Sequence, residues 1–149
     1  MNYLTIQEIN QKEKSLLETA KSIAKRSFSK NGHYVGCAIL AKSGNIYTGA
    51  TISHSRIVGS TCAERMAVDQ IILNQEEPIV CVIVGKLNRT KWGKNSLCTP
   101  CGCCLEMLWE LQMHANLENI DLLCSNWDLN RILQTKLSEL FPRFEAVKR

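Results

Sequence analysis

The chain has 149 residues, of which 45% are hydrophobic and 21% are charged, and its formal net charge is +4. This length suits a single hydrophobic core, so we expect residues 1–149 to form one domain. The composition is typical of a globular protein, and no apolar run reaches the about 18 residues that a membrane-spanning helix needs. The mild positive charge is spread along the chain and does not predict a nucleic-acid partner.

Eight cysteines are present, and residues 1–5 lack the basic and apolar regions of a secretory signal peptide. We therefore expect a cytoplasmic protein, in which clustered cysteines bind metal more often than they form disulfides. Four of them crowd one segment: Cys98, Cys101, Cys103 and Cys104. Three others lie in apolar runs and are expected to be buried as small hydrophobic residues: Cys37, Cys81 and Cys124.

Apolar residues recur at helical spacing over residues 6–26 and predict an amphipathic helix, with Thr5 as N-cap and Glu8 as its capping-box partner. Polar, irregular residues 51–60 lead into a second helix that begins near Cys62. Between these two helices the pattern predicts a hairpin, with a strand over 34–40, a turn over 41–45 and a strand over 46–51.

Residues 78–86 are a nearly continuous β-branched run, which predicts a central strand covered on both faces. A loop over residues 87–97 follows. Its cations and tryptophan would suit a nucleic-acid contact, but a solvated loop is the better interpretation. These residues, with the lysine just before the loop, are Lys86, Arg89, Lys91, Trp92 and Lys94.

Pro100 is expected in the first turn of a third helix that runs through Leu111. A strand over residues 120–124 and a last helix over 129–140 complete the prediction. The resulting order is α-β-β-α-β-α-β-α, which predicts an α/β fold: a three-layer α-β-α sandwich around a mixed sheet.

Two stretches carry the chemistry. Residues three apart on a helix share a face, so Cys101 and Cys104 can reach one ion while Cys103 points elsewhere. Cys62, at the start of a facing helix, would be the third ligand, and helix N-termini favour thiolates. Zinc suits such sulfur ligands, and three ligands leave one tetrahedral position open, as in catalytic sites. We therefore expect one catalytic zinc per chain.

Glu64 lies beside this ligand set rather than in it. A zinc-bound water is acidified, and Glu64 could take its proton and pass it to a leaving nitrogen. A ligand-x-Glu followed by Pro-Cys-x-x-Cys is similar to the signature of zinc-dependent nucleobase deaminases. The alternative is a closed, non-catalytic zinc site built from the four crowded cysteines, with Glu64 as a helix N-terminal acid. It leaves the spacing from Cys62 to Glu64 unexplained.

These motifs resemble the cytidine deaminase family, in its small homotetrameric form with three cysteine ligands. The similarity covers nearly the whole length. It lies in a Val-Gly strand, a hairpin, the two zinc motifs and a C-terminal Leu-x-Pro: residues 35–38, 44–49, 62–65, 100–104 and 140–142.

The resemblance implies hydrolytic deamination of cytidine and deoxycytidine in pyrimidine salvage, with active sites completed by neighbouring chains of a homotetramer. Cys62, Cys101 and Cys104 would be the zinc ligands and Glu64 the proton shuttle. Main-chain groups near Ala63 and Thr99 would contact the pyrimidine ring. Arg65 would compensate the charge of three thiolates, since a guanidinium hydrogen-bonded to them draws charge away from the metal.

The departures from the family lie where the substrate is chosen. The Asn-x-Glu that holds the ribose hydroxyl falls on Thr51-Ile52-Ser53, and the Phe before the Val-Gly strand falls on His33. The Arg-Gln after the last cysteine falls on 105–106. Thr51 and Ser53 are shorter and neutral, so we expect a cytosine compound held with weakened sugar selectivity. The main alternative within the class is the blasticidin S deaminases, a related branch acting on a modified cytosine nucleoside. We expect a small-molecule substrate, and neither a membrane nor a nucleic acid as partner.

Overall fold

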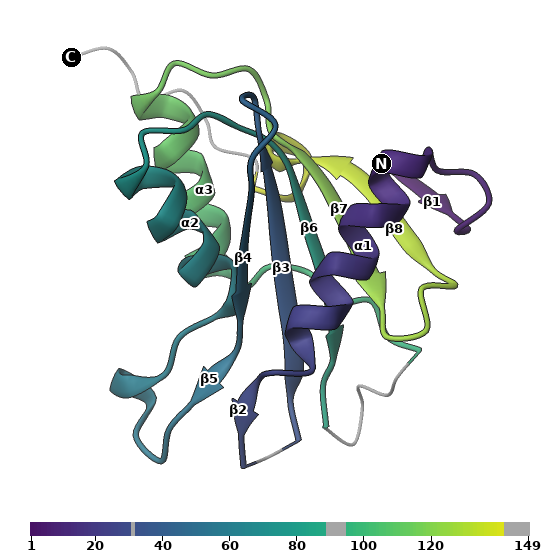
Figure 1. Ribbon diagram of the computed structural model, residues 1–149, viewed down its shortest axis with the longest axis vertical. Helices are drawn as coiled ribbons and strands as arrows, with labels where there is room; N and C mark the ends of the chain where they lie inside the picture. The colour runs from purple at the N-terminus through teal and green to yellow at the C-terminus, as the bar shows by residue number, and fades with distance from the viewer. Residues whose placement is uncertain (31, 89–94, 142–149) are drawn as a thin grey trace.

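The computed structural model describes residues 1–30, 32–88 and 95–141. Its main sheet has six strands in the order β1-β8-β7-β6-β3-β4 (Figure 1). β6 and β7 run parallel and the other neighbours run antiparallel, so the sheet is mixed, as predicted. The strands are β1 Asn2–Leu4, β3 Tyr34–Ala41, β4 Ile46–Ala50, β6 Pro78–Lys86, β7 Asp121–Asn126 and β8 Ile132–Lys136.

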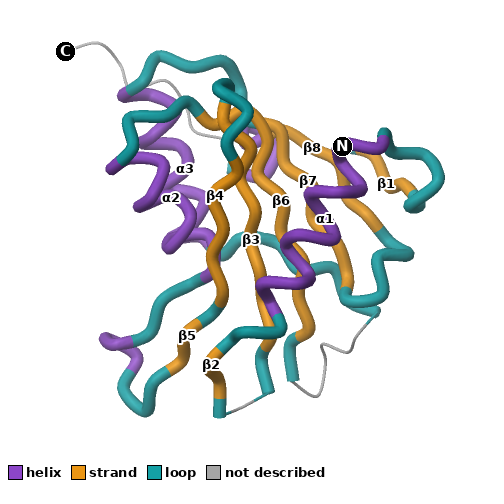
Figure 2. The backbone as a smooth tube through the Cα atoms, in the orientation of Figure 1, coloured by secondary structure: helices purple, strands orange, loops and turns teal. Residues whose placement is uncertain are grey.

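Helices cover both faces of this sheet and produce the predicted three layers (Figures 1 and 2). Successive side chains of a strand point to opposite faces. Thus Ala38 and Leu40 of β3 pack in the core under α1, whereas Cys37 and Ile39 pack in the core under α2 and α3. The helices are α1 Gln11–Ala24, α2 Ala63–Leu73, α3 Gly102–His114 and the short α4 Leu137–Leu140.

The central strand and the buried cysteines are where the sequence places them. Val82, Ile83 and Val84 of β6 are fully buried, because the strand has neighbours on both edges and helices on both faces. Three thiols, those of Cys37, Cys81 and Cys124, are also fully buried. They fill the core as small hydrophobic groups.

The predicted helix over residues 129–140 is wrong. Residues 132–136 form β8, which pairs with both β1 and β7, and only Leu137–Leu140 is helical. Ile132 packs in the core under α1 and Leu133 in the core under α2 and α3, which is the two-residue alternation of a strand buried on both faces. The expected order also lacks β1, β2 and β5, which are only two or three residues long.

The predicted N-cap of the first helix is also wrong. The helix begins at Gln11, and its capping box joins Asn10 and Glu13: the Glu13 N–H donates to Asn10 Oδ1 at 2.8 Å and the Asn10 N–H to Glu13 Oε2 at 3.0 Å. Thr5 and Glu8 make the same kind of contact in the preceding turn, where the Thr5 N–H donates to Glu8 Oε2 at 2.7 Å. Residues 2–4 pair with β8, so the chain turns before it can begin the helix.

Helix α1 crosses β3 at Gly36, where the two backbones nearly touch. A Cβ at this position would lie 2.7 Å from the Ala24 nitrogen and closer still to the Ala20 carbonyl oxygen. Both atoms belong to the helix backbone and cannot swing aside. Glycine is therefore required for the helix to lie on the sheet.

We expect Gly36→Ala to lower the free energy of unfolding by at least about 1–3 kcal/mol, the usual cost of overpacking. Urea denaturation measures the loss. Gly102→Ala is the matched control, because nothing lies within 4 Å of a Cβ added there. It should change stability by less than about 1 kcal/mol. Equal effects of the two substitutions would contradict the close approach of α1 and β3.

Candidate functional site

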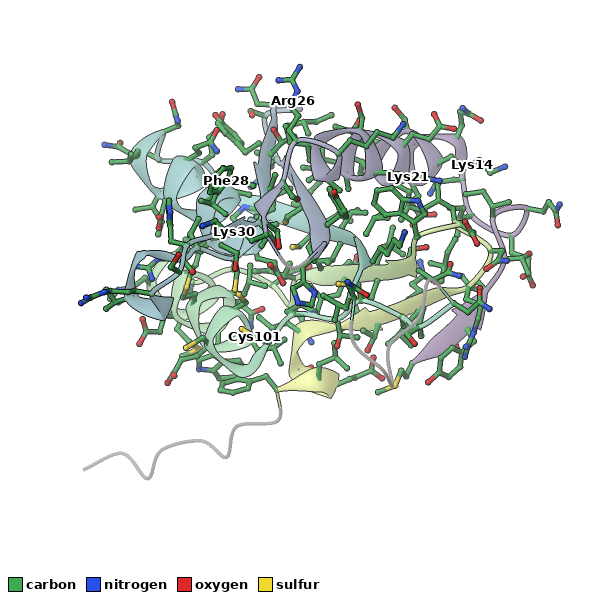
Figure 3. The ribbon with its side chains drawn as sticks, turned by 90° about the horizontal axis from the view of Figure 1, so that it is seen from below. Lys14, Lys21, Arg26, Phe28, Lys30 and Cys101 are labelled. Carbon is green, nitrogen blue, oxygen red and sulfur yellow. The ribbon has the colours of Figure 1, made fainter. Side chains whose placement is uncertain are left out.

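The N-termini of α2 and α3 lie side by side, facing the lower end of the molecule in Figure 1, and bring three cysteines together. Cys62 is the N-cap of α2, Cys101 is the N-cap of α3, and Cys104 lies in the first turn of α3. Pro100 directly precedes the N-cap, one step outside its predicted place in the first turn. Figure 3 looks onto this end, where Cys101 is labelled.

The sulfurs are close enough to share one metal ion. The Sγ atoms of Cys101 and Cys104 lie 3.5 Å apart, and all three sulfurs lie within 4.8 Å of one another. Tetrahedral zinc with Zn–S bonds of about 2.3 Å places its sulfur ligands about 3.8 Å apart. Among the described residues, no other group of His, Cys, Asp or Glu has this proximity. The donor set therefore fits zinc.

The electrostatics of the cluster favour a cation when all three thiols are ionised. The neighbouring Cys104 thiol lowers the pKa of Cys62 to about 6, with smaller contributions from Cys101 and the positive charge of Arg65, against the effect of burial. The same interaction with Cys62 raises the pKa of Cys104. Three adjacent thiolates repel one another unless a cation lies between them. The positive ends of α2 and α3 supply part of that compensation.

The structure does not favour a closed site built from the four crowded cysteines. Cys103 is exposed and lies outside the cluster. Cys98 is buried against Gly85, where a Cβ would lie 2.9 Å from the Cys98 Cβ, and burial raises the pKa of its thiol to about 12. Cys98 is therefore a protonated thiol in the wall beside the cluster.

Glu64 lies on the first turn of α2 with only 4% of its surface exposed. Burial raises its pKa to about 7, and the charge of Cys62 acts in the same direction, whereas the residue's own backbone N–H opposes the shift. A buried carboxyl group with a raised pKa beside a cluster of possible metal ligands is a common feature of catalytic sites.

A cavity of about 400 Å³ opens beside Glu64 and the cysteines. Three of the predicted substrate contacts, Thr51, Ser53 and Thr99, line it. The fourth, Ala63, is fully buried and is not in the cavity wall. The remaining wall residues are His33, Val35, Cys62, Glu64, Leu87, Leu97, Cys98, Pro100 and Cys101.

Two wall residues were not singled out from the sequence. Leu87 and Leu97 are apolar residues without a chemical pattern, and they reach the cavity from the two ends of the loop after β6. The departure from the family at His33 was the one available signal. Arg89, Lys91, Trp92 and Lys94, considered as a nucleic-acid contact, lie outside the described residues.

The positions of Thr51 and Ser53 follow from main-chain contacts. The Thr51 N–H donates to the Val35 carbonyl at 3.0 Å, and the Thr51 carbonyl accepts from the Phe28 N–H at 3.0 Å. Ser53 belongs to β5 Ile52–Ser53, which pairs in parallel with β2 Phe28–Ser29. Ser53 of β5 and Thr51, just before this strand, thus place two neutral hydroxyl groups in the cavity wall.

A larger depression of about 550 Å³ does not compete as a reaction site. Four of its five charged groups are paired: Lys42 lies 3.1 Å from Glu77 and Lys136 lies 2.7 Å from Asp121. None of the clustered cysteines lines it.

Arg65 is exposed on α2 and acts on the cluster through its charge. Among the described contacts, its guanidinium donates no hydrogen bond to a sulfur. It lines a groove of about 410 Å³ with Ile72, Met107 and Leu111, which belong to α2 and α3.

Comparisons with solved structures agree with this fold. Cytidine deaminase from Burkholderia pseudomallei superposes with a TM-score of 0.74 at 20% identity, covering 90% of this chain and 98% of that one. Cytidine deaminase from Bacillus anthracis superposes with a TM-score of 0.68 at 20% identity, covering 91% of this chain and 90% of that one. Cytidine deaminase from Mycobacterium tuberculosis superposes with a TM-score of 0.66 at 21% identity, covering 93% of this chain and 100% of that one. At these identities the likeness establishes the fold.

The family comparison goes further, because it rests on the sequence around the site. The profile of the cytidine and deoxycytidylate deaminase zinc-binding region matches residues 10–117, most of the chain. The matched segment contains all three clustered cysteines and Glu64. This protein therefore belongs to the cytidine and deoxycytidylate deaminase zinc-binding family.

Proposed function

We propose that this protein catalyses the zinc-dependent hydrolytic deamination of a cytosine nucleoside. Cytidine or deoxycytidine and water would give uridine or deoxyuridine and ammonia. The observation that carries the proposal is the burial of Glu64 beside three clustered cysteine sulfurs, at the wall of a cavity of about 400 Å³. That volume is within the usual range for small-molecule sites.

In this proposal Cys62, Cys101 and Cys104 hold one zinc ion per chain. A zinc ion so held supplies an acidified water ligand as the nucleophile. Cys62 and Cys101 line the cavity, so a substrate bound there would lie beside the residues that hold the ion. Glu64 takes up the proton of the nucleophile and delivers it to the amino group that leaves C4 as ammonia, which requires one carboxylate to act as base and then as acid.

The wall around Glu64 would orient the substrate. We assign Thr99 and the main chain near Ala63 to the pyrimidine ring, and Thr51 and Ser53 to the sugar. Their hydroxyl groups can bond a sugar directly or through water, although they carry no charge. Arg65 would compensate the negative charge of the three thiolates from the exposed side of α2.

The proposal also includes an oligomeric state, a cellular compartment and a metabolic role. Ile72, which lines the groove between α2 and α3, is 53% exposed, and Met113 near the end of α3 is 60% exposed. Exposed apolar side chains on these helices support association into a homotetramer. All eight cysteines are free thiols, which suits the cytoplasm and a role in pyrimidine salvage. None of the described helices is long and apolar enough to cross a membrane.

Replacing Cys62 by alanine should remove most of the zinc, because two sulfurs from one helix turn are left to hold the ion. Metal analysis of the purified protein measures zinc, with about one ion per chain expected before the substitution. Cys103→Ala is the matched control and should retain zinc, because Cys103 lies outside the cluster. If the Cys62→Ala variant kept its zinc and the Cys103→Ala variant lost it, the result would indicate the closed zinc site built from the four crowded cysteines.

The activity itself is tested by ammonia release from cytidine, deoxycytidine, cytosine and blasticidin S. We expect turnover of the two nucleosides by the zinc-loaded protein. Glu64→Gln should lower the rate by roughly 10²–10⁴-fold, because an amide cannot carry the proton. Its zinc content and melting temperature should stay unchanged. A zinc-loaded protein that releases ammonia from none of the four compounds would be a non-catalytic zinc scaffold.

Restoring the family's residues by Thr51→Asn together with Ser53→Glu should raise kcat/KM for cytidine by about ten- to hundredfold. A carboxylate accepts a charge-assisted hydrogen bond from a ribose hydroxyl, worth about 1.5–3 kcal/mol. Ser55→Glu, which adds the same charge outside the cavity, should not have this effect. The assignment of the sugar site would be contradicted if the unmodified protein already strongly preferred substrates with an intact ribose and the double variant showed no gain in kcat/KM for cytidine.

A further inference from the structure

His33 is held in the cavity wall by contacts to its backbone and to its ring. The His33 N–H donates to Ser29 Oγ at 3.3 Å, which ties the residue to β2. The Asn88 N–H donates to His33 Nδ1 at 3.1 Å, which ties the ring to the segment after β6. A ring anchored in this way has one orientation before any ligand arrives.

The contact to Asn88 also determines the tautomer. Because Nδ1 accepts a hydrogen bond, the proton of the neutral imidazole is on Nε2. Within residues 1–30, 32–88 and 95–141, Nε2 has no protein acceptor. His33 is only half-buried and lines the cavity, so its Nε2–H is available to a ligand.

The cavity wall that contains His33 also offers hydroxyl groups. Thr51 and Ser53 contribute them, and among the described residues that line the cavity Glu64 is the only acid, placed beside the cysteines. A second depression of about 260 Å³ shares Ser53 and is lined by Lys30, His54 and Ser55. Figure 3 shows Lys30 on this end of the molecule.

We propose that His33 is a specificity-determining residue whose Nε2–H donates to an oxygen of the group attached to N1 of cytosine. This inference rests on the proposed function. A carboxylate in this region would accept a hydrogen bond from a substrate hydroxyl. His33 instead donates a hydrogen bond, so the substrate oxygen must accept it. The recognised class is therefore a cytosine compound whose N1 substituent presents an acceptor oxygen, and free cytosine lacks the contact.

Binding and turnover can be separated with Glu64→Gln as the background, because this variant should bind without reacting. Titration calorimetry of the zinc-loaded variants measures Kd for cytidine and for cytosine. Adding His33→Phe should raise Kd for cytidine by about three- to tenfold, the effect of one neutral hydrogen bond, and leave cytosine unchanged. Glutamine can accept from Asn88 and donate to the ligand, so His33→Gln should restore part of the affinity. His114→Phe, the same change on α3 far from the cavity, is the matched control.

Cytidines that lack one hydroxyl at a time identify the oxygen. The hydroxyl that His33 contacts should lose its contribution to binding in the His33→Phe background, so the two changes should not be additive. Zinc content and melting temperature establish that the variant is folded. If the His33→Phe variant is not folded, the His33→Ala variant is used in its place, because it removes the same hydrogen-bond donor.

Each outcome bears on the inference. The inference would be overturned if His33→Phe weakened the binding of cytidine and cytosine equally. It would also be overturned if the effects of His33→Phe and of removing each hydroxyl were fully additive, or if cytidine binding could not be measured. Failure of the proposed function has a different signature: no ammonia is released by the unmodified protein, while the coupling between His33 and one hydroxyl is still measured. Turnover of cytidine with no effect of His33→Phe would overturn the role of His33 and leave the reaction intact.

Discussion

Three sulfurs within 4.8 Å of one another are the constraint on which the rest of the structure depends. They can be ionised together only where positive charge converges on them. The fold provides this convergence by starting two helices at the same place, so that the partial charges of both N-termini act on the cluster. The carboxyl end of β6 lies beside this point, because Cys98, three residues before Cys101, packs on Gly85.

Close backbone approaches hold the two helix starts in place. A Cβ on Gly49 of β4 would lie 2.8 Å from the Met66 Cβ in α2, and a Cβ on Gly85 would lie 2.9 Å from the Cys98 Cβ. Larger residues at these strand positions would push α2 and the loop before α3 away from the sheet. The separation of the sulfurs therefore depends on glycines that carry no chemistry themselves.

How far the sequence predicts this protein depends on how local each signal is. The Cys-x-Glu and Cys-x-x-Cys motifs are each local, so their residues could be singled out from the sequence, and the resemblance to a known signature indicated that Cys62, Cys101 and Cys104 share one site. The burial of Glu64 could not be predicted from either motif. The helix over 129–140 was wrong because Ile132, Leu133 and Leu137 fit a helical period, and only pairing with β1 and β7 makes residues 132–136 a strand. The two-residue strands β2 and β5 and the apolar cavity wall depend entirely on tertiary contacts. No pattern in the chain predicts that Leu87 and Leu97 line the same cavity.

The cavity has two ends that are built differently. Helix N-termini make the end with the cysteines and Glu64, and their geometry depends on backbone packing against the sheet. Strand ends and Ser53 of β5 make the other end. Main-chain hydrogen bonds and strand pairing hold Thr51 and Ser53 there, and hydrogen bonds from main-chain N–H groups to side-chain acceptors hold His33. Side chains at this second end can therefore change without moving the sulfurs. This separation explains how the chain retains the cysteine and glutamate motifs of its family while the residues at this second end differ from the family pattern in size, charge and hydrogen-bond polarity.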